Sequence, residues 1–563
     1  MVVVRNVFRI HCFIILITGI IASACGRAPD AQQSPAPAPP AEPRAGARLV
    51  TGLGQHHHPI STSNPQAQQF FDQGFSLVFA FNHEEAVRSF QQAAVLDPQA
   101  AMPLWGIAWA LGPNYNLDID DPRAKQASEA MKTAEALGAR ASQAERDYIA
   151  AMALRYSPDP KADRSALARR YSDAMGALAR KYPDDLDAAT LYAESVMNLR
   201  PWKLWTLDGK PAEDTERIVS ILESVLKRDP NHLGANHYYI HTVEASPTPE
   251  RALPSAERLK TMAPAAGHLV HMPAHILART GDQAGAAGAN LAGVVADRAY
   301  LKEAPPDSFY GMAYYSHNLH FLADSEMMQG RFAEAQRAAA EVAERLAPHA
   351  DMMPMIESMA VMPVSVLLRF GRDADVLMLP APPMNRPVML AWWHFARGVA
   401  LARTRQVDAA SVEWGQLMAA TAGVPESAVF GGTGLESART VLALAQRVLD
   451  ARIAWARGDR DQAIALWKEA VTVADRLSYD EPPVWFYPLR ESLGAALLLA
   501  GRATDAEQVF RDDLVRHPRN ARSLFGLRES LQKQGKGDDA AWVNRAFEDA
   551  WKNADSKLTL EDL

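Results

Sequence analysis

Residues 67–100 read AQQFFDQGFSLVFAFNHEEAVRSFQQAAVLDPQA, and this stretch decides the fold. Counted from its first residue, glycine stands at position 8 (Gly74), alanine at 20 (Ala86), phenylalanine at 24 (Phe90) and proline at 32 (Pro98). Small residues let two helices cross closely, an aromatic ring fills the space between them, and proline ends the second helix. The stretch therefore predicts two antiparallel helices joined by a short turn.

The same spacing recurs near the end of the chain. Residues 487–519 have Gly494, Ala506, Phe510 and Pro518 at positions 8, 20, 24 and 32. This pattern resembles the tetratricopeptide repeat (TPR), a helix–turn–helix unit of 34 residues. The spacing also fits units from residues 444 and 521. More degenerate units start near residues 101, 186, 233, 267 and 316, and several carry insertions. The resemblance implies an all-α fold, a TPR-type helical-hairpin solenoid with degenerate central repeats and insertions.

The composition suits a soluble folded body and argues against nucleic acid as a partner. Apolar residues make up 48% of the 563 residues and charged residues 22%, which is ordinary for a globular chain. The net charge is -8, and no basic block is present.

The first residues have the pattern of an export signal. Arg5 and Arg9 precede an apolar run that ends in IASAC, with Cys25 as its last residue. This ending resembles the lipobox of bacterial lipoproteins, which implies acylation of Cys25, a membrane anchor and a position in the cell envelope, facing the periplasm or the cell surface. Plain cleavage before Cys25 is the alternative. The other cysteine, Cys12, lies inside the signal, so thiolate metal sites are excluded.

These features predict four segments. Residues 1–24 form the signal peptide, and residues 25–65 form the lipidated cysteine with an Ala/Pro-rich tether. Residues 66–350 form an N-terminal TPR-like array with a histidine-rich groove, and residues 351–563 form a C-terminal TPR-like array.

Histidines recur at fixed positions of three consecutive central units. These units start at Leu233, Gly267 and Ser316, in a register set by alanines and prolines and by no histidine. In the TPR family, positions 2, 5 and 9 of the first helix line the concave groove where ligands bind. Apart from Gly234, the nine positions hold seven histidines and one aspartate, namely His237, His241, His268, His271, His275, His317, His320 and Asp324.

Side chains at these spacings share one face of a helix, and neighbouring helices pack side by side. We therefore expect them to converge on one patch, with Glu194 and Glu244 as additional candidates at its border. Neutral imidazoles and carboxylates are ligands of zinc, copper(II) and iron(II). The pattern predicts a divalent transition-metal site of open identity, although Pro273 should interrupt the helix that carries His268, His271 and His275.

Two weaker candidates lie earlier in the chain. The histidines of residues 56–58 can add ligands by folding over the groove, but exposed tail histidines are commoner and are expected here. Trp105 and Trp109 fall on positions 5 and 9 of their unit, which indicates either an aromatic shelf in the groove or buried packing between helices.

Three functions stay open at this point. The leading interpretation is an exported TPR scaffold with a histidine-rich transition-metal centre on its concave face. The second is a metal-dependent enzyme, a hydrolase or oxidase, that uses this centre. The third is a metal-free envelope scaffold that binds a peptide or protein in the groove. The sequence does not decide whether the protein is an enzyme.

Overall fold

The computed structural model describes residues 46–305, 308–351 and 355–563. Residues 46–563 form one compact unit. The predicted signal peptide and Cys25 lie outside the described residues. Within the described part of the chain, no helix is long and apolar enough to cross a membrane.

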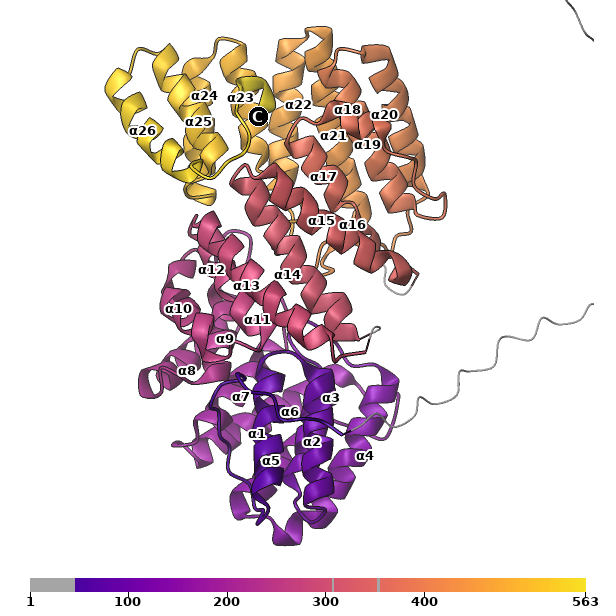
Figure 1. Cartoon of the computed structure of the whole chain (residues 1–563), viewed down its shortest axis with the longest axis vertical. Helices are drawn as coiled ribbons and strands as arrows, with labels where there is room; N and C mark the ends of the chain where they lie inside the picture. Colours follow the sequence, from indigo (N-terminus) through magenta and orange to yellow (C-terminus); the bar gives the residue numbers. More distant parts are fainter. Residues whose placement is uncertain (1–45, 306–307, 352–354) are drawn as a thin grey trace, which may run out of the picture. The chain divides into compact units, whose positions relative to one another are not determined.

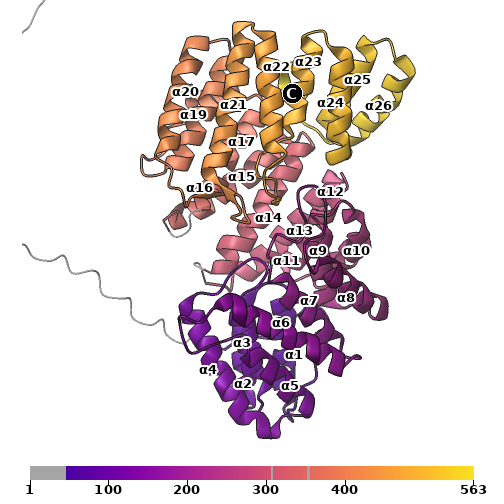
Figure 2. The ribbon, with the colours of Figure 1, turned by 180° about the vertical axis from the view of Figure 1, so that it is seen from behind.

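Pairs of helices follow one another along the chain (Figures 1 and 2). The earlier pairs are α1 (Pro65–Phe79) with α2 (His83–Leu96), α3 (Met102–Leu111) with α4 (Asp121–Leu137), α5 (Gln143–Ala153) with α6 (Arg164–Lys181), α7 (Leu186–Met197) with α8 (Thr215–Arg228), and α9 (Leu233–Val243) with α10 (Leu253–Met262). In the next pair, α11 (Gly267–His271) and α12 (Pro273–Arg279) together face α13 (Gln283–Leu301).

The pairing continues to the end of the chain. The later pairs are α14 (Phe309–Met328) with α15 (Phe332–Leu346), α16 (Ile356–Ala360) and α17 (Met362–Arg369) before α18 (Asp373–Met378), α19 (Pro387–Arg403) with α20 (Val407–Ala422), α21 (Ala438–Arg457) with α22 (Arg460–Ala474), α23 (Leu489–Leu499) with α24 (Ala503–Arg516), and α25 (Ala521–Lys533) with α26 (Gly537–Ala550). The strands of the described residues are β1 (Val429–Phe430) and β2 (Glu436–Ser437), which form one antiparallel pair. The prediction of an all-α array of TPR-type hairpins is confirmed.

Phe90 shows why the repeat pattern produces this fold. Its buried ring lies between Gly74 in α1 and Gly106 in α3, where a Cβ atom would stand 2.7 and 2.6 Å from ring carbons. Any larger side chain would push the helices apart, so glycine is required for this close crossing. Phe510 takes the same place between Gly494 and Gly526 at the other end of the chain.

Two large apolar clusters form most of the core, and α14 contributes to both. A small third cluster includes Ala274, Leu277 and Phe321. Tyr310 and Tyr314 pack in the cluster of the earlier helices, whereas Leu319 and Leu322 pack in the cluster of the later ones. The later cluster begins at Ala287 in α13. The two large clusters therefore meet within α13 and α14.

Residues 46–64, which we expected in the tether, belong to the folded unit. The Val50 amide donates to Gln73 Oε1 at 2.7 Å, and the Ala265 amide donates to the Gly52 carbonyl at 2.9 Å. These hydrogen bonds join the segment to α1 and to the loop before α11. The described part of the tether is thus a strap against the helices.

Candidate metal centre

Four helices carry the central histidines. His237 and His241 lie one turn apart on α9, His268 and His271 on α11, His275 on α12, and His317 on α14. Pro273 separates α11 from α12 as expected, because proline has no amide hydrogen to donate. Met272 between them keeps helical dihedral angles, so all three histidines of the two short helices stay near one face.

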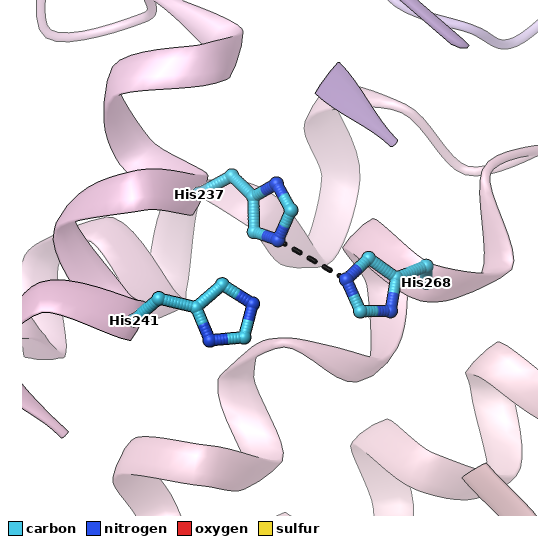
Figure 3. Close-up of side chains that lie close together, drawn as sticks. All are labelled: His237, His241 and His268. Carbon is cyan, nitrogen blue, oxygen red and sulfur yellow. Dashed lines mark hydrogen bonds between the residues drawn. The ribbon is translucent and has the colours of Figure 1, made fainter. Parts of the chain in front are cut away.

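His237, His241 and His268 form the first group of imidazoles. One nitrogen from each ring lies within 4.8 Å of the other two. Figure 3 shows the rings turned toward one another from two helices, with His237 Nε2 3.1 Å from His268 Nε2. Nδ1 of His268 and Nε2 of His241 are buried and make no hydrogen bond.

His271, His275 and His317 form the second group, with ligand nitrogens again within 4.8 Å of one another. The Nε2 atoms of His271 and His275 lie 2.8 Å apart. The ring of His317 lies 4.9 Å from that of His271, measured between centroids.

Glu244, just after α9, connects the two groups. Its Oε1 lies 2.9 Å from Nδ1 of His241, and its Oε2 lies 2.6 Å from Nδ1 of His275. Burial raises the pKa of Glu244, but the two imidazoles outweigh burial and hold the pKa below its usual value. The carboxylate is therefore ionised between the two rings.

Oxygen atoms fix which ring nitrogens carry hydrogen. Nδ1 of His237 lies 2.6 Å from the Phe79 carbonyl oxygen, and Nδ1 of His271 lies 2.7 Å from Asn290 Oδ1. Like the contacts of Glu244, these contacts favour hydrogen on Nδ1 and leave the lone pair on Nε2. An imidazole held in this way is ready to bind a metal through Nε2.

Burial keeps these imidazoles neutral. It is the largest cause that lowers the pKa of His237, His268, His271 and His317 well below the usual value, and nearby imidazoles lower each pKa further. Neutral histidine is the form that binds metals.

Glu481 is a member of the site that the sequence did not predict. It lies in the loop between α22 and α23, and its carboxyl group contacts Nδ1 of His275. Burial, followed by the charge of Glu244, raises the pKa of Glu481 well above its usual value, which favours the protonated form of this carboxyl group. No local motif marks Glu481, because a distant part of the chain supplies it.

The histidines do not line an open groove, which corrects the expectation from the repeat family. The side chains of α9, α11 and α12 are covered: His237 and His271 are 0% exposed and His241 is 2% exposed. Phe81 packs against His237 with ring centroids 4.6 Å apart, and Tyr115 packs against His241 at 5.4 Å. Aromatic residues of the chain itself therefore cover these two imidazoles.

Two predicted members on α14 are not brought into either group. Phe321, next to His320, makes the ring contacts with His271 and His275, while burial lowers the pKa of His320 to about 4. Asp324 lies about 10 Å beyond His317 along the helix, at 1.5 Å per residue. Burial raises its pKa to about 7, and its charged neighbours are Arg369 and His517.

Three further candidates have other roles. Glu194 pairs with Arg155 at 3.8 Å and accepts a hydrogen bond from Asn198, and it belongs to neither group of imidazoles. Trp105 and Trp109 are 0% and 2% exposed and pack on Phe75. The structure thus favours buried packing over the aromatic shelf.

Comparisons with known proteins do not establish a family or a function for this chain. No protein-family model and no curated protein matches the chain. The solved human IFIT1 dimer with m7Gppp-AAAA is 12% identical, with a TM-score of 0.33 over 87% of this chain and 91% of that chain. The APC/C hetero-tetramer Cut9–Hcn1 is 11% identical, with a TM-score of 0.36 over 87% of this chain and 80% of that chain. The function is therefore argued from the residues of this chain.

Proposed function

We propose that the protein binds divalent transition-metal ions at the buried histidine centre formed by α9, α11, α12 and α14. Two groups of three imidazoles, connected by Glu244, offer ligands for more than one ion. Nitrogen donors with a carboxylate suit zinc, copper(II) and iron(II). Because the rings of α9, α11 and α12 are covered and only His317 is partly exposed, the proposal is metal binding within a helical scaffold and not turnover of a large substrate.

The contact between His271 and His275 carries the proposal. Their Nε2 atoms lie 2.8 Å apart, while Nδ1 of each faces an oxygen, Asn290 Oδ1 for His271 and Glu244 Oε2 for His275. A neutral imidazole that donates from Nδ1 has only a lone pair at Nε2, so two lone pairs face each other. A cation between these nitrogens removes the repulsion.

A proton is a weaker explanation of this contact than a metal. Burial lowers the pKa of both His271 and His275, which disfavours an imidazolium. A change of tautomer at His275 would turn a lone pair of Nδ1 toward the ionised Glu244 carboxylate, and only a hydrogen bond from the carboxyl group of Glu481 to Nδ1 would compensate for it. Two nitrogens of a tetrahedral metal site stand about 3.3 Å apart for bonds of about 2.0–2.1 Å. A small separation of the rings is enough to admit an ion.

Residues around the centre orient the imidazoles and exclude water. Glu244, Asn290 and the carbonyl of Phe79 hold Nδ1 atoms, and such contacts fix ring orientation and raise ligand basicity. Phe81 covers His237 and His268, with ring centroids 4.6 and 5.1 Å away. A bound divalent ion would also balance the buried charge of Glu244.

This burial argues against the metal-free peptide scaffold at these histidines. A peptide could reach His241 only by displacing Tyr115 and Trp202, whose rings lie 5.4 and 5.6 Å from it. Protein binding elsewhere on the helical array is not affected by this argument.

Metal analysis of the purified protein tests the proposal. We expect at least one bound divalent transition-metal ion per chain at neutral pH, measured by inductively coupled plasma mass spectrometry. The double variant His241→Gln/His275→Gln should lose metal from the centre, because both rings contact Glu244 and glutamine preserves much of the volume. His394→Gln is the matched control. Nδ1 of His394 lies 2.6 Å from a carboxylate oxygen of Glu413, and neither residue belongs to the centre.

Two results would overturn the proposal. One is a wild-type protein that binds no transition metal after incubation with zinc, copper or iron salts and removal of excess ion. The other is a double variant that binds as much metal as the His394→Gln control.

The localisation of the protein in the cell is a separate proposal that rests on the sequence. The IASAC ending supports acylation of Cys25 and a lipid-anchored position in the cell envelope. An envelope protein without disulfides is consistent with a helical body that relies on packing and bound metal for its stability.

A further inference from the structure

A second cluster of histidines lies where residues 46–64 cross the early helices. His56 and His58 turn inward, each with a side chain 10% exposed, whereas His57 turns outward at 60%. The expectation of an exposed tail therefore holds for His57 alone. A cavity of about 1030 Å³ adjoins the cluster and is lined by His56, His58 and the start of α7.

Asp187, in the first turn of α7, is the centre of this cluster. Its Oδ2 lies 2.7 Å from Nδ1 of His58. Its Oδ1 lies 3.1 Å from Nε2 of His56 and 3.2 Å from Nε2 of His232, and Nε2 of His56 makes no hydrogen bond. Asp187 is 7% exposed, so its carboxylate is buried among three imidazoles. A buried charge of this kind is costly unless neighbouring groups or a bound cation balance it.

Asp185 brings a second carboxylate to the same place. The hydroxyl of Tyr148 donates to its Oδ2 at 2.7 Å, and the Ala188 amide donates to its Oδ1 at 3.0 Å. These donors hold the carboxylate at the beginning of α7. Ligand atoms of His58, Asp185 and Asp187 all lie within 4.8 Å of one another.

His232 supports the cluster without serving as a ligand. Its Nδ1 accepts a hydrogen bond from the Ala235 amide at 3.2 Å, so the ring hydrogen is on Nε2. That nitrogen lies 3.4 Å from Thr190 Oγ1 and 3.2 Å from Asp187 Oδ1. A nitrogen that carries hydrogen cannot bind a metal, and His232 instead positions Asp187 from the beginning of α9.

We propose that His56, His58, Asp185 and Asp187 form a second divalent transition-metal site, open to the cavity and separate from the buried centre. Two imidazoles and two carboxylates supply nitrogen and oxygen ligands, and the imidazoles favour zinc-like ions over calcium or magnesium. The cavity lining also includes Glu145, Asp184 and Asp229 but no lysine or arginine among its residues. The resulting negative field attracts cations.

The site does not depend on the proposed function of the buried centre. Its ligands come from residues 56–58 and 185–187, and none of them belongs to either group of the centre. Phe79 lies between this cluster and the buried centre. Its ring is 5.3 Å from the ring of His56, and its carbonyl oxygen accepts a hydrogen bond from Nδ1 of His237. The two sites can therefore be tested independently.

Zinc titration of the metal-stripped full chain tests this site. With a chromophoric chelator as competitor, His56→Ala/His58→Ala should bind about one zinc ion fewer than wild type, or bind that ion at least ~100-fold more weakly. Asp187→Asn should weaken the same ion while preserving side-chain shape. His57→Ala is the matched control, because His57 is the adjacent exposed histidine and pairs with Asp72 at 2.8 Å, and it should titrate as wild type.

The variants separate the two sites. His241→Gln/His275→Gln should leave the ion that depends on His56 and His58 in place, even if the buried centre binds no metal. The inference is overturned if His56→Ala/His58→Ala and Asp187→Asn, with wild-type circular dichroism, bind zinc with wild-type stoichiometry and affinity. Such a result would leave His58 and Asp187 as a hydrogen-bonded pair that lines the cavity.

Discussion

Glu481 contacts His275 from a loop that lies far along the chain, between α22 and α23. Nδ1 of His275 thus faces two buried carboxyl groups, since Glu244 lies 2.6 Å from the same atom. The pKa of Glu481 is raised and that of Glu244 is lowered, so one proton is held by Glu481 while Glu244 keeps its charge. The two glutamates therefore have different roles at one histidine.

Substitution of each glutamate should separate these roles. Glu244→Gln removes the charge that orients His241 and His275, and we expect metal affinity at the centre to fall about 10- to 100-fold. Glu481→Gln replaces a protonated carboxyl by an amide of similar shape, and affinity should change less than about threefold. Competition titration with a chelator measures both constants. A larger loss for Glu481→Gln than for Glu244→Gln would contradict the assignment.

Removal of metal should lower thermal stability. An ion that binds only the folded chain stabilises it by about 4 kcal/mol when free metal is 1,000 times the Kd. We expect a strong chelator to lower the Tm and added zinc to restore it. Circular dichroism measures the Tm in each case. In the His241→Gln/His275→Gln variant the chelator should shift the Tm much less. An equal shift in the variant would place the stabilising ion elsewhere.

The sequence predicted the fold because the packing signals are local. Gly74, Phe90 and their counterparts Gly494 and Phe510 stand at the same spacing in units at both ends of the chain. Each unit therefore carries the information for its own helix pair. The short segment α16–α18 and the strap before α1 lack this pattern, and the sequence did not predict them.

The candidate site was predictable in part for the same reason. His237, His241, His271 and His275 follow the helical period within units whose register is set by other residues. The register failed at α14, which begins at Phe309 and not at Ser316, so Phe321 takes the contact expected of His320. Glu481 joins the site through tertiary packing, which no local pattern reports.

The Gly74–Phe90 crossing predicts a steric effect on stability. Gly74→Ala places a Cβ about 2.7 Å from the Phe90 ring, and overpacking of this kind costs about 1–3 kcal/mol. Gly288→Ala is the control, because Gly288 is an exposed position in α13 with nothing near its added Cβ. That change should be neutral or stabilise by about 0.5–1 kcal/mol. Urea unfolding measures both, and similar effects of the two substitutions would contradict the packing argument.

The proposed lipid anchor is tested at Cys25. The wild-type protein should partition into membranes or detergent with a modified N-terminus, and Cys25→Ala should release or mislocalise it. Fractionation and mass spectrometry of the N-terminus give the result. A soluble wild-type protein with an unmodified N-terminus would refute acylation while leaving export intact.

Asp297 predicts a dependence of stability on pH. It is 1% exposed, and burial raises its pKa to about 7 even though Tyr310 and Asn318 donate hydrogen bonds to it. In the unfolded chain the pKa is near 3.8. Below pH 4 the carboxyl is protonated in both states. Between pH 4 and 7 the unfolded chain loses this proton while the folded chain keeps it, so the free energy of unfolding falls as pH rises.

Asp297→Asn cannot ionise and should lose this dependence. We expect the unfolding free energy of the variant, relative to wild type, to increase from pH 5 to pH 8 by an amount of order 1–4 kcal/mol. Asp173→Asn, at an exposed position of α6, is the control and should show no such change. Urea unfolding at each pH measures the difference. A variant that tracks wild type across this range would show that Asp297 is already ionised in the folded protein.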